Sequence, residues 1–510
     1  MALPARVRRT ALAVGAALLL PLGVAQAAPP GDTPGSPGIG DPYYADYGNG
    51  GYDVDHYSIH VAYDPASDRL VGHTRIRAHS TQALSRFDLD FVLPVATVRV
   101  DGQRASFTQG EHELVVRPRK AIRAGKAMTV DVTYAGVPST IISHGIRPWI
   151  RTPDGVAAVG EPEIAAWWYP ANDHPRDKAT YDVSVTVAKD LEALGNGVLV
   201  SNTVKRGMRT WHWREAKPMA PYLAFFVVGQ FDITSSVTDD GLPVVTAVAS
   251  NGGSEGEYAA ADLARTPEVI DFESQQFGPY PFDAIGGVAP AADFGFALEN
   301  QTRPVYTRGF WRNGPNIYVV VHENAHQWYG DSVSVRNWRD IWLNEGFASF
   351  AEWLWSEKHG EGTGAQLFQE YWDHYRDNTG FWSVTIGDPG AHNEFNGAVY
   401  DRGAMALQAL RTRIGDPAFF TVMRTWAAKH RYGNGAVPQF IRLAERVSGE
   451  DLGSFFDAWL YTGQRPAPTE ENGFPPDFTP RSTSYARAHA PASWQQIQLT
   501  HRVLGSLERR

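Results

Sequence analysis

Hydrophobic and polar residues alternate along much of the first half of the chain. The alternating runs occupy residues 57–63, 73–78, 96–100, 128–134 and 181–187. Turn-forming residues separate these runs. Because successive side chains of a strand point to opposite faces of its sheet, a period of two is typical of half-buried β-strands. The pattern therefore predicts an all-β domain over residues 46–235.

The periodicity changes in the second half, where apolar residues recur every three or four positions. Residues 404–411 and 455–460 have this amphipathic pattern, and residues 342–355 form an aromatic-rich stretch with helical spacing. We therefore predict a mostly helical domain over residues 236–465. An all-β domain followed by a helical domain places the chain in the α+β class.

The start of the chain has the features of a targeting segment. Arg6, Arg8 and Arg9 precede an apolar run, and residues 25–27 (Ala-Gln-Ala) provide a small-x-small cleavage site. Residues 1–27 are therefore predicted to be a cleaved signal peptide, because the apolar run is too short and too poorly flanked to favour a membrane span. We expect a secreted, extracellular protein without a membrane anchor, exported by either the Sec or the twin-arginine route.

Two further segments lack the periodicity of the domains. Residues 28–45 are rich in Gly and Pro, and we expect a flexible leader there. Residues 466–510 are rich in Pro, and we expect a poorly ordered tail.

Composition narrows the function classes. The chain has 510 residues, a formal net charge of −10 at pH 7 and no cysteine. The absence of cysteine excludes disulfides and a lipid anchor, so stability must come from a large core. The acidic balance argues against a nucleic-acid partner. Nothing in the composition indicates the oligomeric state.

One short motif carries a metal-binding pattern. His322, Glu323 and His326 form His-Glu-x-x-His. On a helix the two histidines lie about 40° apart around the axis, so both rings share one face and can bind one Zn²⁺. Glu323 is then placed beside the open coordination position, where a base for the metal-bound water is needed.

A third ligand is available downstream. Glu345 lies in the aromatic-rich stretch, and a helix packed against the first could bring its carboxylate to the metal. The metzincin class would require Gly at 329 and His at 332, and the chain has Tyr329 and Ser332 instead. We therefore predict one zinc ion per chain, held by His322, His326 and Glu345.

These motifs resemble a known family. Residues 322–330 (His-Glu-Asn-Ala-His-Gln-Trp-Tyr-Gly) and 342–348 (Trp-Leu-Asn-Glu-Gly-Phe-Ala) are similar to the gluzincin aminopeptidases of the M1 family, relatives of aminopeptidase N and leukotriene A4 hydrolase. The resemblance covers about residues 45–465. It implies a saddle-like β domain followed by a thermolysin-like catalytic domain. It also implies a short form without the large C-terminal helical domain of many members.

The resemblance extends to an edge strand that lines the substrate cleft of the family. The family has Gly-Ala-Met-Glu-Asn where this chain has residues 296–300. Ala297, Glu299 and Asn300 match, so the resemblance implies that they contact substrate and that Glu299 binds its α-ammonium group. Phe296 replaces the glycine, so the shape of the first side-chain pocket does not carry over.

The resemblance implies two more functional residues. Counting back from the Asp-x-Pro turn at 173–175 assigns a second ammonium-binding role to Glu161, with Glu163 as the competitor and an exposed loop acid as the alternative. Tyr400 lies in a segment similar to Tyr-Glu-Lys-Gly-Ala, which implies a hydrogen bond to the developing oxyanion, the alternative being a packed core tyrosine. Glu352, two turns after Glu345, is our candidate partner for a ligating histidine.

Together these features indicate a secreted zinc aminopeptidase that acts on peptides with a free N-terminus. Glu323 would move the proton from the zinc-bound water to the leaving amine. Three alternatives remain open: an epoxide hydrolase on the same zinc site, a thermolysin-like endopeptidase that would not need Glu161 and Glu299, and a catalytically dead binding module. The preferred N-terminal residue and the physiological substrate also remain open.

Overall fold

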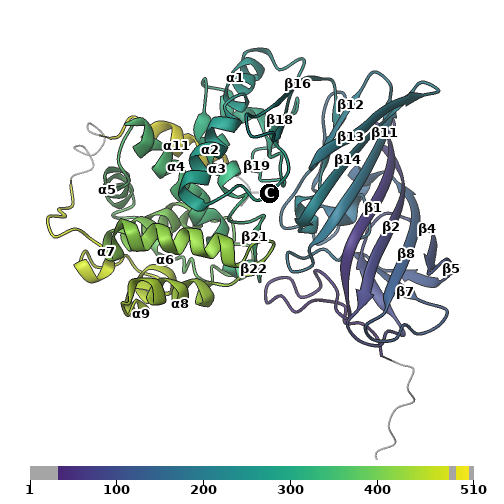
Figure 1. Cartoon of the computed structure of the whole chain (residues 1–510), viewed down its shortest axis with the longest axis horizontal. Helices are drawn as coiled ribbons and strands as arrows, with labels where there is room; N and C mark the ends of the chain where they lie inside the picture. The colour runs from purple at the N-terminus through teal and green to yellow at the C-terminus, as the bar shows by residue number, and fades with distance from the viewer. Residues whose placement is uncertain (1–32, 482–489, 505–510) are drawn as a thin grey trace, which may run out of the picture.

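The computed structural model describes residues 33–481 and 490–504. The predicted signal peptide lies outside the described residues and stays a prediction. Figure 1 shows two bodies side by side, one built of β-sheets and one mainly of helices, as the α+β prediction requires. Within the described ranges no helix is both long and apolar enough to span a bilayer.

The N-terminal body is organised around one large sheet. Its strand order is β13-β14-β11-β1-β2-β8-β4-β5, with β1 parallel to β11 and antiparallel to β2. The strands are β1 (Tyr52–Asp64), β2 (Arg69–Ser80), β4 (Val95–Val100), β5 (Gln103–Arg104), β8 (Ala127–Gly136), β11 (Ala179–Ala188), β13 (Val198–Lys205) and β14 (Met208–Met219). In β8 buried and more exposed positions alternate along the whole strand, which is the pattern expected for a sheet with one covered face.

Two smaller sheets complete this body. The first contains β3 (Phe87–Asp90), β7 (Glu113–Arg117) and β6 (Ser106–Gln109); the second contains β12 (Glu192–Gly195), β15 (Phe226–Gly229), β10 (Val156–Ala158) and β9 (Trp149–Arg151). Strand β15 is buried at every position, because it lies between β12 and β10 and its Phe226 packs against Trp149 and Trp168.

The helical body begins earlier than the sequence predicted. A five-stranded sheet joins β16 (Phe231–Val237), β17 (Pro243–Ala249), β18 (Ile285–Ala289), β20 (Val305–Tyr306) and β19 (Ala297–Leu298). The predicted boundary at 235–236 cuts through β16 and is therefore wrong by about one strand. The reason is that β16 pairs with β17 rather than with a strand of the N-terminal body.

The helices of this body are α1 (Gly253–Leu263), α2 (Thr266–Phe277), α3 (Ile317–Ala325), α4 (Trp342–His359), α5 (Gly364–His374), α6 (Thr379–Ser383), α7 (Gly397–Lys429), α8 (Val437–Ser448), α9 (Gly453–Phe456) and α11 (Trp494–Leu504), with a short β pair of β21 (Val333–Val335) and β22 (Gly433–Gly435). Helices α1, α2 and α3 contact the five-stranded sheet, and α4, α5, α7 and α8 pack on α3 and on one another. Every residue of α3 is buried. Its β-branched run at 319–321 would suit a strand, but packing on all sides makes a helix the stable form.

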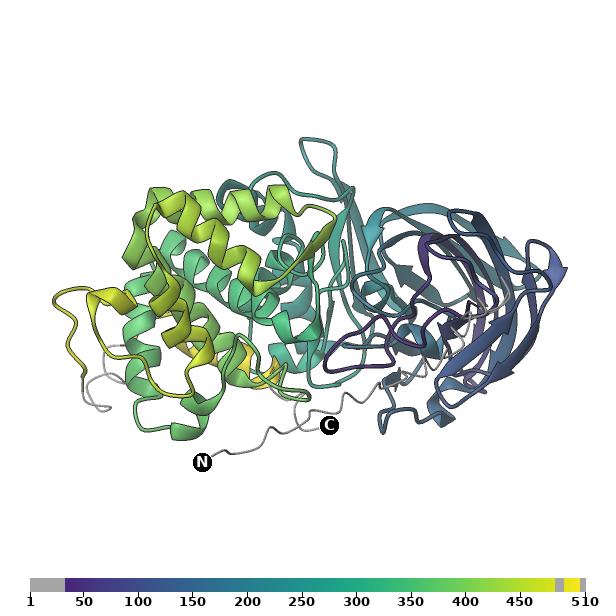
Figure 2. The same ribbon diagram turned by 90° about the horizontal axis from the view of Figure 1, so that it is seen from below.

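The predicted flexible leader is packed where the structure describes it. Asp41 is buried, accepts a hydrogen bond from the Trp338 amide at 2.9 Å and contacts His174 at 3.0 Å. The segment after residue 33 thus crosses from the β domain to the catalytic domain (Figure 2). The prediction of flexibility is wrong for residues 33–45, because polar and aromatic side chains between the glycines and prolines find partners on both bodies.

The predicted poorly ordered tail also needs correction. Phe474 is buried against Phe368 and Trp459, and residues 494–504 form helix α11. The buried positions of α11 are Ile497, Thr500, His501 and Leu504. Their spacing is that of an amphipathic helix, so the signal was present in the sequence behind the proline-rich stretch.

Candidate active site

The three predicted metal ligands converge in the structure. His322 lies on α3, His326 is the capping residue that directly follows its last residue Ala325, and Glu345 lies in the first turn of α4. The Nε2 atoms of His322 and His326 lie 3.4 and 3.5 Å from Oε2 of Glu345. Ligand atoms at about 2.0–2.1 Å from a tetrahedral zinc are about 3.4 Å apart, so the donor set fits this metal. Two histidines and one carboxylate also leave a position for water or substrate.

The outer nitrogen of each histidine has a partner that orients the ring. His322 Nδ1 donates to Glu352 Oε1 at 2.7 Å, and His326 Nδ1 donates to the Tyr329 carbonyl at 3.0 Å. These bonds place the lone pair of each ring on Nε2, which faces Glu345. Glu352 therefore occupies the supporting place that the spacing along α4 predicted.

Burial and neighbouring charge set the protonation of the two central acids. Burial alone would raise the pKa of Glu345, but His326 and His322 lower it to about 2, so this acid stays ionised. Burial raises the pKa of Glu323 to about 8, against the opposing effect of the same two histidines. Glu323 Oε1 is buried and has no hydrogen-bond partner within the described part of the chain, so it can accept a proton from a ligand in the site.

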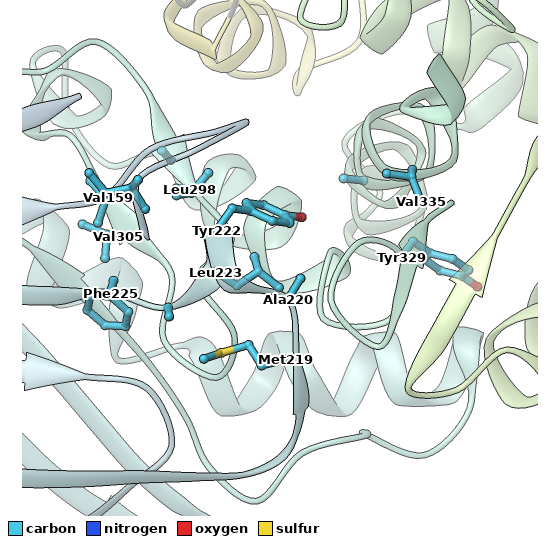
Figure 3. Packing of buried hydrophobic residues seen from close by; sticks show 14 of the residues in the cluster. Val159, Met219, Ala220, Tyr222, Leu223, Phe225, Leu298, Val305, Tyr329 and Val335 are labelled. Atoms are coloured by element: carbon cyan, nitrogen blue, oxygen red, sulfur yellow. The ribbon is translucent and has the colours of Figure 1, made fainter. Parts of the chain in front are cut away.

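Glu299 and Glu161 lie near this centre. Glu299 is buried and accepts a hydrogen bond from the Tyr222 hydroxyl at 3.0 Å. Tyr222 belongs to the buried segment that packs beside Leu298 between the two bodies (Figure 3). Burial raises the pKa of Glu161, and the carboxylates of Glu299 and Glu345 raise it further.

The remaining candidate residues near Glu161 and Glu299 in the sequence are Glu163, Ala297 and Asn300. The competitor Glu163 accepts from the Tyr47 hydroxyl at 2.6 Å and contacts His144 at 3.2 Å, so it is engaged inside the β domain. Ala297 lies on the edge strand β19, as expected. Asn300 is fully buried and donates to the Leu223 carbonyl at 3.0 Å. Its Oδ1 has no partner within the described residues, so its contact with substrate stays a prediction beside this contact between the two domains.

Tyr400 reaches the metal centre from the first turn of α7. Its ring stacks on that of His322 with centroids 5.9 Å apart and planes at 21°. Burial raises the pKa of the Tyr400 phenol, and the carboxylates of Glu345, Glu161, Glu323 and Glu299 raise it further, so the hydroxyl keeps its proton and can donate a hydrogen bond.

Two models of one family match this chain. The "Peptidase M1 N-terminal domain" matches residues 53–223 and the "Peptidase family M1 domain" matches residues 263–459. This chain belongs to peptidase family M1.

Individual relatives agree with this membership. Glutamyl aminopeptidase of Bos taurus is 29% identical over 320 residues, which are 59% of this chain and 33% of that protein. Aminopeptidase M1 of Arabidopsis thaliana is 26% identical over 341 residues, 62% of this chain and 36% of that protein. The chain thus spans about a third of the length of the curated relatives it matches.

A solved structure matches nearly from end to end. The M1 zinc metallopeptidase from Deinococcus radiodurans superposes on this M1 peptidase with a TM-score of 0.76 and 26% identity, covering 84% of this chain and 99% of that one. A mutant of that protein bound to a Tyr-Ser-Ala substrate matches with a TM-score of 0.75. The two-domain arrangement is therefore shared with a zinc metallopeptidase.

One residue of the site of this M1 peptidase was missed by sequence reasoning. His501 on α11 lies between Glu352 and Asp401, with its Nε2 2.8 Å from Glu352 Oε1 and its Nδ1 bonded to Asp401. Burial alone would lower the pKa of His501, but Glu352 and Asp401 raise it to about 10. The sequence signal for His501 was a histidine at a buried position of an amphipathic helix. The prediction of a poorly ordered tail meant that this signal was not used.

Proposed function

We propose that this M1 peptidase is a zinc aminopeptidase that removes the first residue of peptides. The observation that carries the proposal is the pair of acids beside the ligand set. Burial and the carboxylates of Glu299 and Glu345 raise the pKa of Glu161, and burial and Glu345 raise the pKa of Glu299, so two ionised carboxylates are disfavoured there. A substrate ammonium would supply the missing positive charge through charge-assisted hydrogen bonds. The names of the relatives, which include aminopeptidases, support the same activity.

The ligand set defines the chemistry that the residues serve. His322, His326 and Glu345 would hold the zinc ion, which when bound acts as a Lewis acid and makes water more acidic. Glu323 accepts a proton from the attacking water and delivers it to the leaving amine; its Oε1 is buried without a hydrogen-bond partner in the described structure and is free to do so. The Tyr400 hydroxyl donates to the carbonyl oxygen as negative charge develops there.

The two ammonium-binding acids decide where the chain is cut. When Glu161 and Glu299 hold the α-ammonium, the first peptide bond is the one presented to Glu323 and Tyr400. A thermolysin-like endopeptidase would have no use for these acids. A dead binding module would have no reason to keep the ligands, the base and the oxyanion donor together.

Blocking the substrate amine tests the proposal. We expect an aminoacyl-arylamide to be cleaved at least about 10²-fold faster than its N-acetyl form, because acetylation removes the charge that the acids bind. Glu299→Ala should raise KM for the free substrate and reduce this discrimination. Glu163→Gln is the matched control, because Glu163 lies on the same loop as Glu161 but is bonded to Tyr47. Equal cleavage of free and blocked substrates would show an endopeptidase instead.

Export is part of the proposal. The basic start, the apolar run and the Ala-Gln-Ala site at 25–27 support it. N-terminal sequencing of the protein recovered from the culture medium should find a chain beginning at Ala28. A chain retained inside the cells with Met1 intact would contradict export.

A further inference from the structure

Helix α11 brings a histidine into the interior of the catalytic domain. Ile497, Thr500, His501 and Leu504 form its buried stripe, and the helix packs against both α3 and α7. Thr500 fixes the position of the helix, because its hydroxyl accepts a buried hydrogen bond of 3.0 Å from Asn316, the residue just before α3. His501 is therefore held between the helix that carries His322 and the helix that carries Tyr400.

The contacts of His501 connect three helices. Its Nε2 bonds Oε1 of Glu352 on α4 at 2.8 Å, and its Nδ1 bonds Oδ1 of Asp401 on α7. The same Oε1 of Glu352 accepts the bond from His322 Nδ1 at 2.7 Å. One carboxylate oxygen is thus shared between a metal-ligand candidate and His501. Asp401 directly follows Tyr400 in the first turns of α7.

The chemistry of these bonds assigns the protons. Ionised carboxylates only accept hydrogen bonds, so a histidine whose two nitrogens each face a carboxylate donates from both. A cationic imidazole between Glu352 and Asp401 compensates two buried acids that would otherwise be costly to keep ionised. Glu352 then remains an acceptor for His322 Nδ1, and the lone pair of His322 stays on Nε2, toward the metal site.

We propose that His501 is a positioning residue of the zinc site, acting through Glu352 on His322 and through Asp401 on the helix turn that carries Tyr400. This inference rests on the proposed zinc function. Helix α11 thereby contributes to the active site, because its His501 bonds the same carboxylate, Glu352, that bonds the candidate metal ligand His322.

A purely structural role for His501 makes a different prediction. In that case, its loss would lower the melting temperature as any defect in the packing of α11 does, without a specific effect on zinc. Ile497→Ala is the matched control, because Ile497 lies one turn away in the same buried stripe. It has no hydrogen-bonding side chain and cannot support Glu352.

Zinc affinity of the full chain separates the two roles. The apparent Kd for zinc would be measured by competition with a metal-binding dye in wild type, His501→Leu, His501→Gln and Ile497→Ala. We expect His501→Leu to weaken zinc binding about 10–100-fold, the range seen when partners of ligating histidines are removed. His501→Gln should recover most of the affinity, because its amide nitrogen can replace Nε2 beside Glu352. Ile497→Ala should lower the melting temperature and leave the zinc Kd unchanged.

A double-mutant cycle tests whether His501 acts through Glu352. If it does, Glu352→Gln with His501→Leu should weaken zinc binding no more than Glu352→Gln alone. With saturating zinc, His501→Leu should lower kcat with little change in KM, because Glu161 and Glu299 are untouched.

The outcomes are separable. A zinc Kd for His501→Leu equal to that of Ile497→Ala, or additive effects in the cycle, would overturn the role of His501 while leaving the zinc peptidase intact. Absence of zinc binding in the wild-type chain would instead overturn the proposed function itself.

Discussion

Replacing Glu323 by Gln should lower kcat about 10²–10⁴-fold while the protein still binds about one zinc ion per chain. The substitution keeps the size and shape of a side chain that is buried among the ligands. It removes the only group on α3 that we assign to proton transfer, and it leaves His322, His326 and Glu345 in place. Turnover and metal content measured on the same preparation check both halves of this prediction.

Tyr400→Phe provides the comparison for Glu323→Gln. The phenol contributes one hydrogen bond to charge that develops in the transition state, so kcat should fall about 10²-fold with KM little changed. The ring that stacks on His322 is retained in Phe, so zinc should be retained as well. Glu323→Gln turning over at the wild-type rate would show that another group is the base.

Glu345→Ala should abolish zinc binding at ordinary metal concentrations and reduce activity to background. Two histidines alone rarely hold zinc in a site that must also admit substrate. Glu345 is the acid whose oxygen lies 3.4 and 3.5 Å from the two histidine nitrogens, and among the described residues it is the one acid grouped with both histidines at ligand-atom separations within 4.8 Å. Metal analysis after dialysis measures the loss directly.

A second acid of α4 serves as the control for Glu345→Ala. Glu357 lies further along the same helix and pairs with Arg411 at 3.0 Å, away from the ligand set. Glu357→Gln should therefore keep its zinc and its activity, even if the melting temperature falls. Zinc retained in Glu345→Ala, or a wild-type chain that contains none, would contradict the assigned ligand set.

The parts of the site that depend on residues close together in the sequence were predictable from it. The spacing of His322 and His326 predicts one face of a helix, and the structure has that helix as α3, with His326 as its C-terminal capping residue. Glu352 lies two turns after Glu345 on α4, and this spacing predicted it as the partner of a ligating histidine, which the structure has as His322. Alternation in the first half likewise predicted strands such as β1 and β8, because strand periodicity is a local property of the chain.

A sequence motif was less informative where a residue contacts a partner that is distant in the sequence. Asn300 matched the family pattern, yet its amide reaches Leu223 in the other domain. Composition was a poor guide to the leader and the tail, where proline and glycine suggested disorder. Asp41 and His501 show why, since each is ordered by residues more than a hundred positions away.

The sequence by itself predicted the candidate ligands His322 and His326, the candidate base Glu323 and the succession of a β domain and a helical domain, since these follow from short-range patterns. Only the tertiary structure decided that β16 belongs to the second domain, that residues 33–45 link the two bodies, and that α11 completes the surroundings of His322. These features depend on which surfaces meet after the chain has folded. A buried carboxylate such as Glu352 needs a compensating partner, and no local pattern shows that the partner comes from His501.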